Sequence, residues 1–164
     1  MAIVDRYVRN AGDKSPAQTS GQEVKALVLN FAIDSTDDDG SKYRFFRSIP
    51  ATAIITKLEV QNDAIAGGVD FDLGIYNTLE GPLKGAVKDA DALAATVDLS
   101  AARDVSNLIS GLSAVALSDN SKTVYELAGD NVDTRQGEYD LVLTGNTVGT
   151  TTGNVGIYLE YLAR

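Results

Sequence analysis

Carboxylates are the side chains in this sequence best able to do chemistry, because its 164 residues include no histidine and no cysteine. The lack of imidazole and thiol groups removes the commonest general base at neutral pH, the usual thiol and imidazole nucleophiles, and zinc sites that depend on such ligands. Disulfides are excluded too, so packing and hydrogen bonds must stabilise the fold. The sequence therefore predicts a protein that is not an enzyme and needs no cofactor.

The densest group of carboxylates lies in the acidic turn DSTDDDGS, which contains Asp34, Asp37, Asp38 and Asp39. Several carboxylate oxygens close together suit a hard cation such as calcium. The spacing does not match a helix–loop–helix calcium site, because with Gly40 at the sixth position Phe46 stands where a bidentate glutamate is required. A looser calcium site between strands stays open as an alternative. A solvated turn that protects a sheet edge is favoured.

A second carboxylate pair, Asp70 and Asp72, occupies alternate positions of the segment VDFDLGIY. Side chains two residues apart on a strand share one face and lie close enough to cooperate as acid and base. No third group is evident to tune them, and alternating aspartates are typical of the wet face of a half-buried strand. A carboxylate-dependent hydrolase is therefore the weakest hypothesis.

Basic and aromatic residues interleave in KYRFFRSI, where Lys42, Arg44 and Arg47 surround three aromatic side chains. Such interleaving occurs in nucleic-acid sites, but the net charge of −9 and the lack of a basic run argue against a nucleic-acid partner. Period-two alternation places Lys42 and Arg44 on the outer face of a strand. We interpret the three basic residues as candidate contacts with a protein partner, beside the simpler interpretation of an ordinary amphipathic strand.

The N-terminal residues 1–22 are predicted to form an arm and a linker, followed by one β-sandwich domain over residues 23–164. Residues 3–8 suit a short edge strand or an arm that lies on another surface, so Ile3, Val4 and Tyr7 are further candidate partner contacts. Residues 11–22 have the Gly, Ser and Pro content of a linker. No apolar run approaches the length of a membrane span and no signal-peptide core is present, so we expect synthesis in the cytoplasm without membrane contact.

The elements that must position these residues are mostly strands. Apolar and polar residues alternate over residues 24–33, 42–49, 54–60, 69–76, 137–144 and 155–162. Short helices are predicted at the Ala-rich residues 89–95 and at residues 122–128, the latter capped by Asp119 or Ser121 and ended by Gly129. No element is assigned to residues 99–117, of which residues 107–117 are compatible with a strand or a helix, and residues 145–154 are expected to form an exposed, mobile tip.

This succession predicts a mainly β fold, an antiparallel, jelly-roll-like β-sandwich with one or two short helices inserted between its strand blocks. A partly open barrel has the same periodicity and remains an alternative.

Several phrases together resemble the head decoration, or cement, proteins of tailed bacteriophages. They are YRFFRSIPATAIITKLEVQNDAIAGGVDFDLGIYNT, GAVKDADALA, KTVYELAG, GEYDLVLTG and a closing Val/Ile/Tyr strand, from Tyr43 to the C-terminus. The resemblance implies a structural protein without catalytic residues that oligomerises as a dimer or trimer and binds the major capsid protein. It would be made in the host cytoplasm and lie on the capsid exterior of the virion, where it stiffens the shell.

A different function also fits the residues, namely a ligand- or glycan-binding β-sandwich module of the adhesin kind. Such a module would use the loop at residues 34–39, with calcium as an aid.

Overall fold

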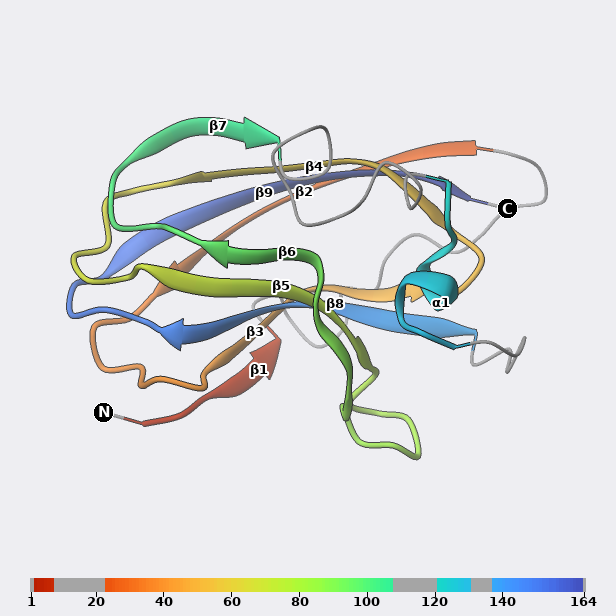
Figure 1. The fold of residues 1–164 in the computed structure, drawn as a ribbon, viewed down its shortest axis with the longest axis horizontal. Coiled ribbons are helices and arrows are strands. Elements are labelled where there is room, and N and C mark those ends of the chain that lie inside the picture. Colours follow the sequence, from red (N-terminus) through yellow and green to blue (C-terminus); the bar gives the residue numbers. More distant parts are fainter. Residues whose placement is uncertain (1, 8–22, 108–120, 131–136, 164) are drawn as a thin grey trace.

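Two β-sheets packed face to face make up the protein (Figure 1), and the computed structural model describes residues 2–7, 23–107, 121–130 and 137–163. The first sheet has the order β1-β3-β8-β5-β6 and the second has the order β2-β9-β4-β7. Their bounds are Asp5–Tyr7 for β1, Glu23–Ile33 for β2, Lys42–Pro50 for β3, Ile54–Asn62 for β4, Asp70–Asn77 for β5, Val87–Val97 for β6, Arg103–Asn107 for β7, Glu138–Thr147 for β8 and Gly153–Ala163 for β9.

The strand order is that of a jelly roll. Leaving β1 aside, the chain runs through eight strands that form the rows β2-β9-β4-β7 and β3-β8-β5-β6, which is the double Greek key of this fold. The described pairings within these rows are all antiparallel. The predicted jelly-roll-like sandwich is therefore confirmed, and the two separate sheets rule out the open barrel.

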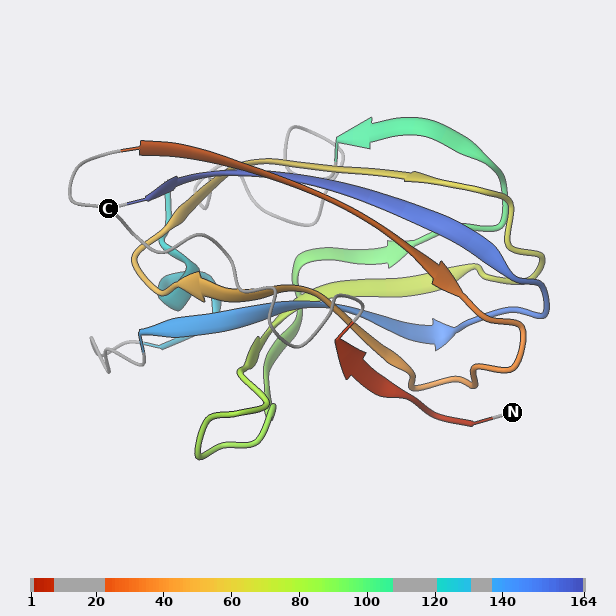
Figure 2. The same ribbon diagram turned by 180° about the vertical axis from the view of Figure 1, so that it is seen from behind.

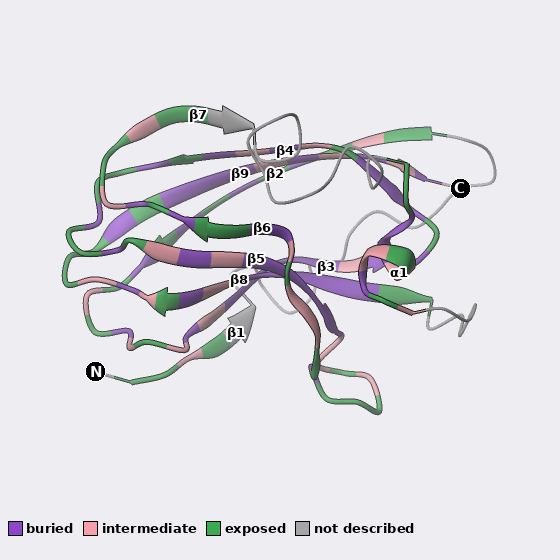
Figure 3. Cartoon of the chain, viewed as in Figure 1, coloured by how far each residue is buried: buried purple, intermediate pink, exposed green. Residues whose placement is uncertain are grey.

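Alternation along β2 shows why the sequence folds this way. Leu27, Leu29, Phe31 and Ile33 are buried between the sheets, and the residues between them are exposed. Figure 3 shows the same buried inner surface on both layers. The rings of Phe31 and Tyr43 stack at 5.8 Å and join one sheet to the other. Burial of this apolar interior, at about 25 cal/mol per Å², is the main term that stabilises the sandwich.

β3 departs from simple alternation after Arg44, and Arg44 itself, a predicted partner contact, is enclosed. The register of β3 against β8 shifts twice, between Arg44 and Phe46 and between Phe46 and Ile49, and Ser48 adopts a positive φ of 55°. Each bulge adds a residue and breaks the period of two. β3 is buried on both faces, and Arg44 is fully enclosed because Asp5 and the segment at Gly85 cover it.

The Ala-rich residues 89–95 form the middle of β6, so the predicted helix there is wrong. β6 pairs with β5 in a register that shifts three times. Opposite it, Gly74 lacks a side chain, and a Cβ at Gly74 would lie 2.3 Å from the carbonyl oxygen of Ala90. The small residues allow this close approach, and pairing with β5 overrides the helix propensity of alanine.

The second predicted helix is confirmed as the short α1, Val124–Leu127. Its cap is Thr123 and not Asp119 or Ser121, since the Thr123 amide donates to the Glu126 carboxylate at 2.7 Å; Asp119 lies outside the described residues. Gly129 follows the helix with φ of 74°, as predicted for its end.

The predictions for residues 99–117 and 145–154 can be compared with the structure in part. Residues 99–117 contribute the strand β7 at Arg103–Asn107, and residues 108–117 lie outside the described part of the chain. Half of the expected tip at residues 145–154 is strand, because β8 extends to Thr147 and β9 begins at Gly153. Val148 in the remaining turn is buried.

Candidate interaction surfaces

The N-terminal strand is joined to the first sheet by one buried arginine. β1 runs parallel to β3, with Asp5 opposite Lys42 and Tyr7 opposite Arg44. The Arg44 guanidinium binds Asp5 in a bidentate manner, with Nε to Oδ1 at 2.7 Å and Nη2 to Oδ2 at 3.1 Å. A planar guanidinium fits a carboxylate in this fork geometry. Arg44 therefore holds β1 against the sheet.

The same guanidinium also connects three other parts of the first sheet. Its Nη1 donates to Asp140 of β8 at 3.3 Å and to the carbonyl of Asn77 at 3.2 Å, and its Nη2 donates to the carbonyl of Gly85 at 3.0 Å. Burial opposes the charged form, but Asp5 and Asp140 outweigh it and raise the pKa of Arg44 above its ordinary value. Arg44 is thus a structural centre, and its side chain does not reach solvent.

The other candidate contacts divide into exposed and enclosed residues. Arg47 is also buried and pairs with Glu80 at 2.7 Å, and Lys42 is half-buried. Ile3 is 66% exposed, whereas Val4 packs partly against the core. The backbone of Tyr7 lies in β1. The structure brings these residues to one edge of the first sheet, and among those whose side chains are described Ile3 is the exposed apolar one.

The acidic turn closes the end of the sandwich through separate hydrogen bonds. Asp37 accepts from the Tyr43 hydroxyl at 2.9 Å, and Asp39 accepts from the Val148 amide at 2.9 Å. Asp34 accepts from the Thr36 amide, and Asp38 from the Asp39 amide. Within the described residues, no group of three or more acidic side chains is placed to share a metal ion. The carboxylates are turned toward donors of the protein.

The N-terminal segment lies directly against this turn. The Ala2 amide donates to the carbonyl of Thr36 at 2.9 Å, and the Asp38 amide donates to the carbonyl of Ala2 at 2.9 Å. The exposed Ile3 and the acidic turn therefore form one continuous surface at the end of the molecule where the N-terminus lies (Figure 1).

Asp70 and Asp72 hold neighbouring strands together. Asn146 of β8 donates to Asp72 at 2.7 Å and lies 3.5 Å from Asp70, and Asp72 also accepts from the Thr96 amide of β6 at 3.0 Å. These contacts join β5 to both of its neighbours. The arrangement is that of a cross-strand tie, as alternating aspartates on a wet face predict.

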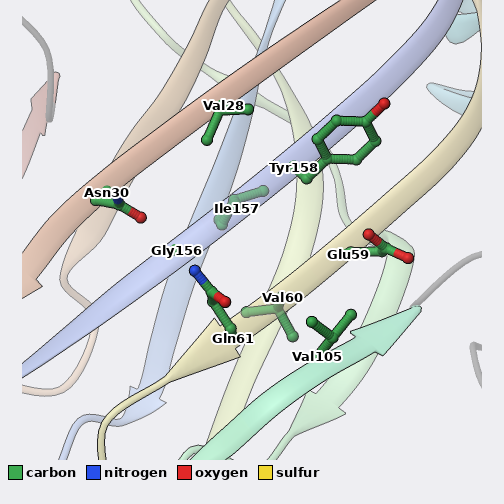
Figure 4. Close-up of a pocket in the computed structure, with 9 residues that line it drawn as sticks. All are labelled: Val28, Asn30, Glu59, Val60, Gln61, Val105, Gly156, Ile157 and Tyr158. Atoms are coloured by element: carbon green, nitrogen blue, oxygen red, sulfur yellow. The ribbon is translucent and has the colours of Figure 1, made fainter.

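The outer face of the second sheet carries a shallow hollow that the sequence pattern did not single out. Figure 4 shows its lining residues, which come from β2, β9, β4 and β7 and enclose about 130 Å³. They are Val28, Asn30, Glu59, Val60, Gln61, Val105, Gly156, Ile157 and Tyr158. Gly156 forms the floor, because a Cβ there would lie 2.6 Å from Asn30 Oδ1.

A wider and more polar hollow of about 430 Å³ continues from Gly156 along the same face, past Asn154 and Asp63 to Arg103. In the sequence, this face could have been found from β2, because the residues that alternation places on its solvent side carry no charge. Val24 and Val28 are each 62% exposed there. Apolar residues gathered on an exposed face mark a surface suited to contact with another molecule.

Among the described residues no helix is long and apolar enough to cross a membrane, and α1 has only four residues.

Comparison with known proteins places the fold among chains of phage capsids. A chain from the capsid of Ralstonia phage GP4 superposes with a TM-score of 0.64 and 12% identity, over 100% of this chain and 99% of that chain. A chain of the capsid asymmetric unit of cyanophage Pam1 gives a TM-score of 0.56 and 14% identity, over 94% and 95%. No protein-family model and no curated protein matches the sequence. At these identities the likeness establishes a shared fold.

Proposed function

We propose that this chain is a structural virion protein that decorates and stabilises the outer surface of a bacteriophage capsid. It would self-associate and bind the lattice of the major capsid protein, and it would act without catalysis or a cofactor. The observation that carries the proposal is the end-to-end superposition on a chain from the capsid of Ralstonia phage GP4, which leaves almost no part of either chain unmatched. The phrases from Tyr43 to the C-terminus that resemble decoration proteins support the same function.

The N-terminal residues 1–22 are proposed to act as an arm and linker beside the sandwich domain at residues 23–164. Ile3 supplies an exposed apolar side chain, and the neighbouring acidic turn supplies a polar rim. An apolar centre with a polar rim is the usual composition of a protein interface. We therefore assign the contact with the capsid to the N-terminal end of the molecule, with Ile3, Val4, Tyr7 and Lys42 as its residues.

The buried Arg44 and Arg47 have a different part in this proposal. They do not touch the partner, but Arg44 fixes the position of β1 through Asp5 and so presents Ile3 in one orientation. A rigid contact loses less conformational entropy on binding than a loose one.

The experiment is mass spectrometry of virions from the phage that carries this gene, combined with binding of the purified chain to heads that lack it. The proposal predicts the polypeptide among the virion proteins and saturable co-sedimentation of the chain with the heads. It also predicts that Ile3→Asp weakens this co-sedimentation. Virions without the polypeptide, together with heads that do not bind the purified chain, would contradict it.

A ligand- or glycan-binding module is the second candidate, and the polar hollow of about 430 Å³ favours it. Its lining includes amide, carboxylate and guanidinium groups from Gln61, Asp104 and Arg103, which can hydrogen-bond sugar hydroxyls. This candidate predicts that the melting temperature rises with an added glycan or with millimolar calcium, because a ligand of the native state stabilises it by mass action. The absence of a shift with a broad glycan set and with calcium would remove it.

A further inference from the structure

Sheet edges decide how a β-sandwich meets its neighbours, and three of the four edges in the described part of this chain are blunted. β1 has three residues, and β7 has five residues and a register shift. β6 is long, but its register shifts three times and Thr96 has a φ of 53°. Short length, bulges and charges are the means by which proteins prevent edge-to-edge pairing.

β2 differs from these three edges in every respect. Its eleven residues pair with β9 in one unbroken register from Glu23 to Ile33, and no described strand pairs with its other side. In Figure 2 it crosses the front of the upper sheet as the outermost strand. Residues 26–33 include no charge and no proline. A long, regular and uncharged edge is a template for an additional strand.

The outer row of β2 is uncharged and, apart from Asn30, apolar. Val24 and Val28 are exposed, with Ala26 and Ala32 on the same face. Val28 also lines the hollow beside Tyr158, so the apolar surface continues from the edge onto the sheet face (Figure 4). A strand added to this edge would bring its own outer side chains against this row.

We propose that the strand that covers this edge is β2 of a second copy of the chain, in an antiparallel pair about a twofold axis that joins the two outer sheets into one. The neutrality of the edge is compatible with this occupant. A second copy brings a net charge of −9 against −9, so the two can meet closely only through a neutral surface, and residues 26–33 provide one. A basic partner would gain by contact with the acidic surface instead.

The sequence of β2 suits pairing with itself. In a register centred on Leu29, Ala26 lies opposite Ala32 of the second copy and Val28 lies opposite its Asn30, so like charges do not meet. In the same register Lys25 lies opposite Ile33 of the second copy, so the charged residues at the start of β2 do not face each other across the pair. Cross-strand pairs of this kind favour association, and opposed like charges disfavour it.

This inference deepens the self-association in the proposed function, and its test uses the isolated chain so that the two can fail separately. Light scattering and sedimentation equilibrium of the full-length protein should give a dimer. Val28→Lys should weaken the dimer by roughly a hundredfold or more, because it brings like charges together in a desolvated contact. The matched control is Val105→Lys, a valine of nearly equal exposure (59% against 62%) on the opposite edge strand of the same sheet, which should leave the dimer unchanged.

A second readout uses the absence of cysteine from the chain. Val28→Cys gives a unique thiol close to its counterpart across the twofold axis, and a short bismaleimide should link the two copies covalently. Val105→Cys should give no link under the same conditions. Thermal melts of all four variants check that each one folds.

A wild-type monomer, a trimer, or a dimer that Val28→Lys leaves intact would overturn the proposal. If the free chain is a monomer and Val28→Lys abolishes co-sedimentation with heads, the edge serves a different protein, which also overturns pairing with a second copy. Failure of capsid binding with an intact, Val28-dependent dimer would overturn the proposed function alone.

Discussion

Arg44 is a residue whose role in the structure differs from the role that its sequence position indicates. On a strand of regular alternation it faces solvent, but Asp5, Asp140 and the carbonyl of Gly85 enclose it. A buried guanidinium persists only when its donors are satisfied. Its surroundings meet that condition with two carboxylates and two carbonyls.

Replacement of this arginine should therefore destabilise the fold strongly. Arg44→Met leaves the carboxylate of Asp140 fully buried without its cation, which should lower the free energy of unfolding by about 3–5 kcal/mol. Asp5 is 37% exposed, so Asp5→Ala should cost only about 1 kcal/mol. Urea denaturation of both variants measures the two values. Equal costs for the two substitutions would refute the description of Arg44 as a structural centre.

Asp130 makes a pH-dependent contribution to the stability of the fold. Burial disfavours its charged form, but hydrogen bonds from Lys88, at 2.7 Å, and from the Tyr139 hydroxyl outweigh burial and lower the pKa of Asp130. A carboxyl whose pKa is lower in the folded state stabilises the fold above its ordinary pKa of about 3.9, and this contribution is lost as pH falls through the folded value.

Asp130→Asn should consequently lower the free energy of unfolding by about 1 kcal/mol at neutral pH. The difference from wild type should shrink as pH falls below about 4. Urea denaturation at a series of pH values gives the comparison, with Asp104→Asn on β7 as an exposed control. A difference that stays constant into acid would show that Asp130 does not act through its charge.

At the scale of elements, the sequence predicted the strands whose two faces meet different environments. β2 alternates between buried and exposed residues, and from Ile157 onward β9 alternates between buried and half-buried ones. β3 and β6 could not be predicted in detail, for a physical reason. Their bulges depend on residues of the partner strand, such as Ala90 beside Gly74. The alternation of residues within one strand therefore cannot predict them.

The candidate surfaces followed the same rule. The acidic turn and the exposure of Ile3 could be inferred locally, whereas the burial of Arg44 and Arg47 depends on chain segments that cover β3 from outside. The hollow around Gly156 requires four strands to be aligned. Its lining could not have been assembled without the strand order.

Gly74 gives a direct test of the β5–β6 contact. Gly74→Val places a branched side chain where a Cβ would already lie 2.3 Å from a backbone oxygen of β6, so the strands must separate, at a cost of about 3 kcal/mol or more. Gly81→Ala is the control, because its nearest neighbour is the hydroxyl of Thr78, a side chain that can rotate. Thermal melts should show a large loss for the first variant and a small one for the second. Similar losses for both would argue against the close approach.

At the scale of the whole molecule, the chain is an acidic jelly roll whose described residues leave one long, regular sheet edge and an apolar residue at the N-terminal end exposed. Neither surface has the arrangement of a catalytic site, and both suit contact with other proteins. They lie on different sheets, since β2 belongs to the second sheet and β1 to the first. Under the proposed function, a second copy and a capsid lattice would therefore bind to separate surfaces.

The central claim is that the chain stabilises a capsid from outside, and a cryo-EM map of virions tests it most directly. The account predicts density for this jelly roll on the outer capsid surface, with the N-terminal end toward the shell. Virions that lack the chain should show no such density and should release their genome at a lower temperature. A map of virions in which the capsid exterior carries no density of this shape would contradict the account.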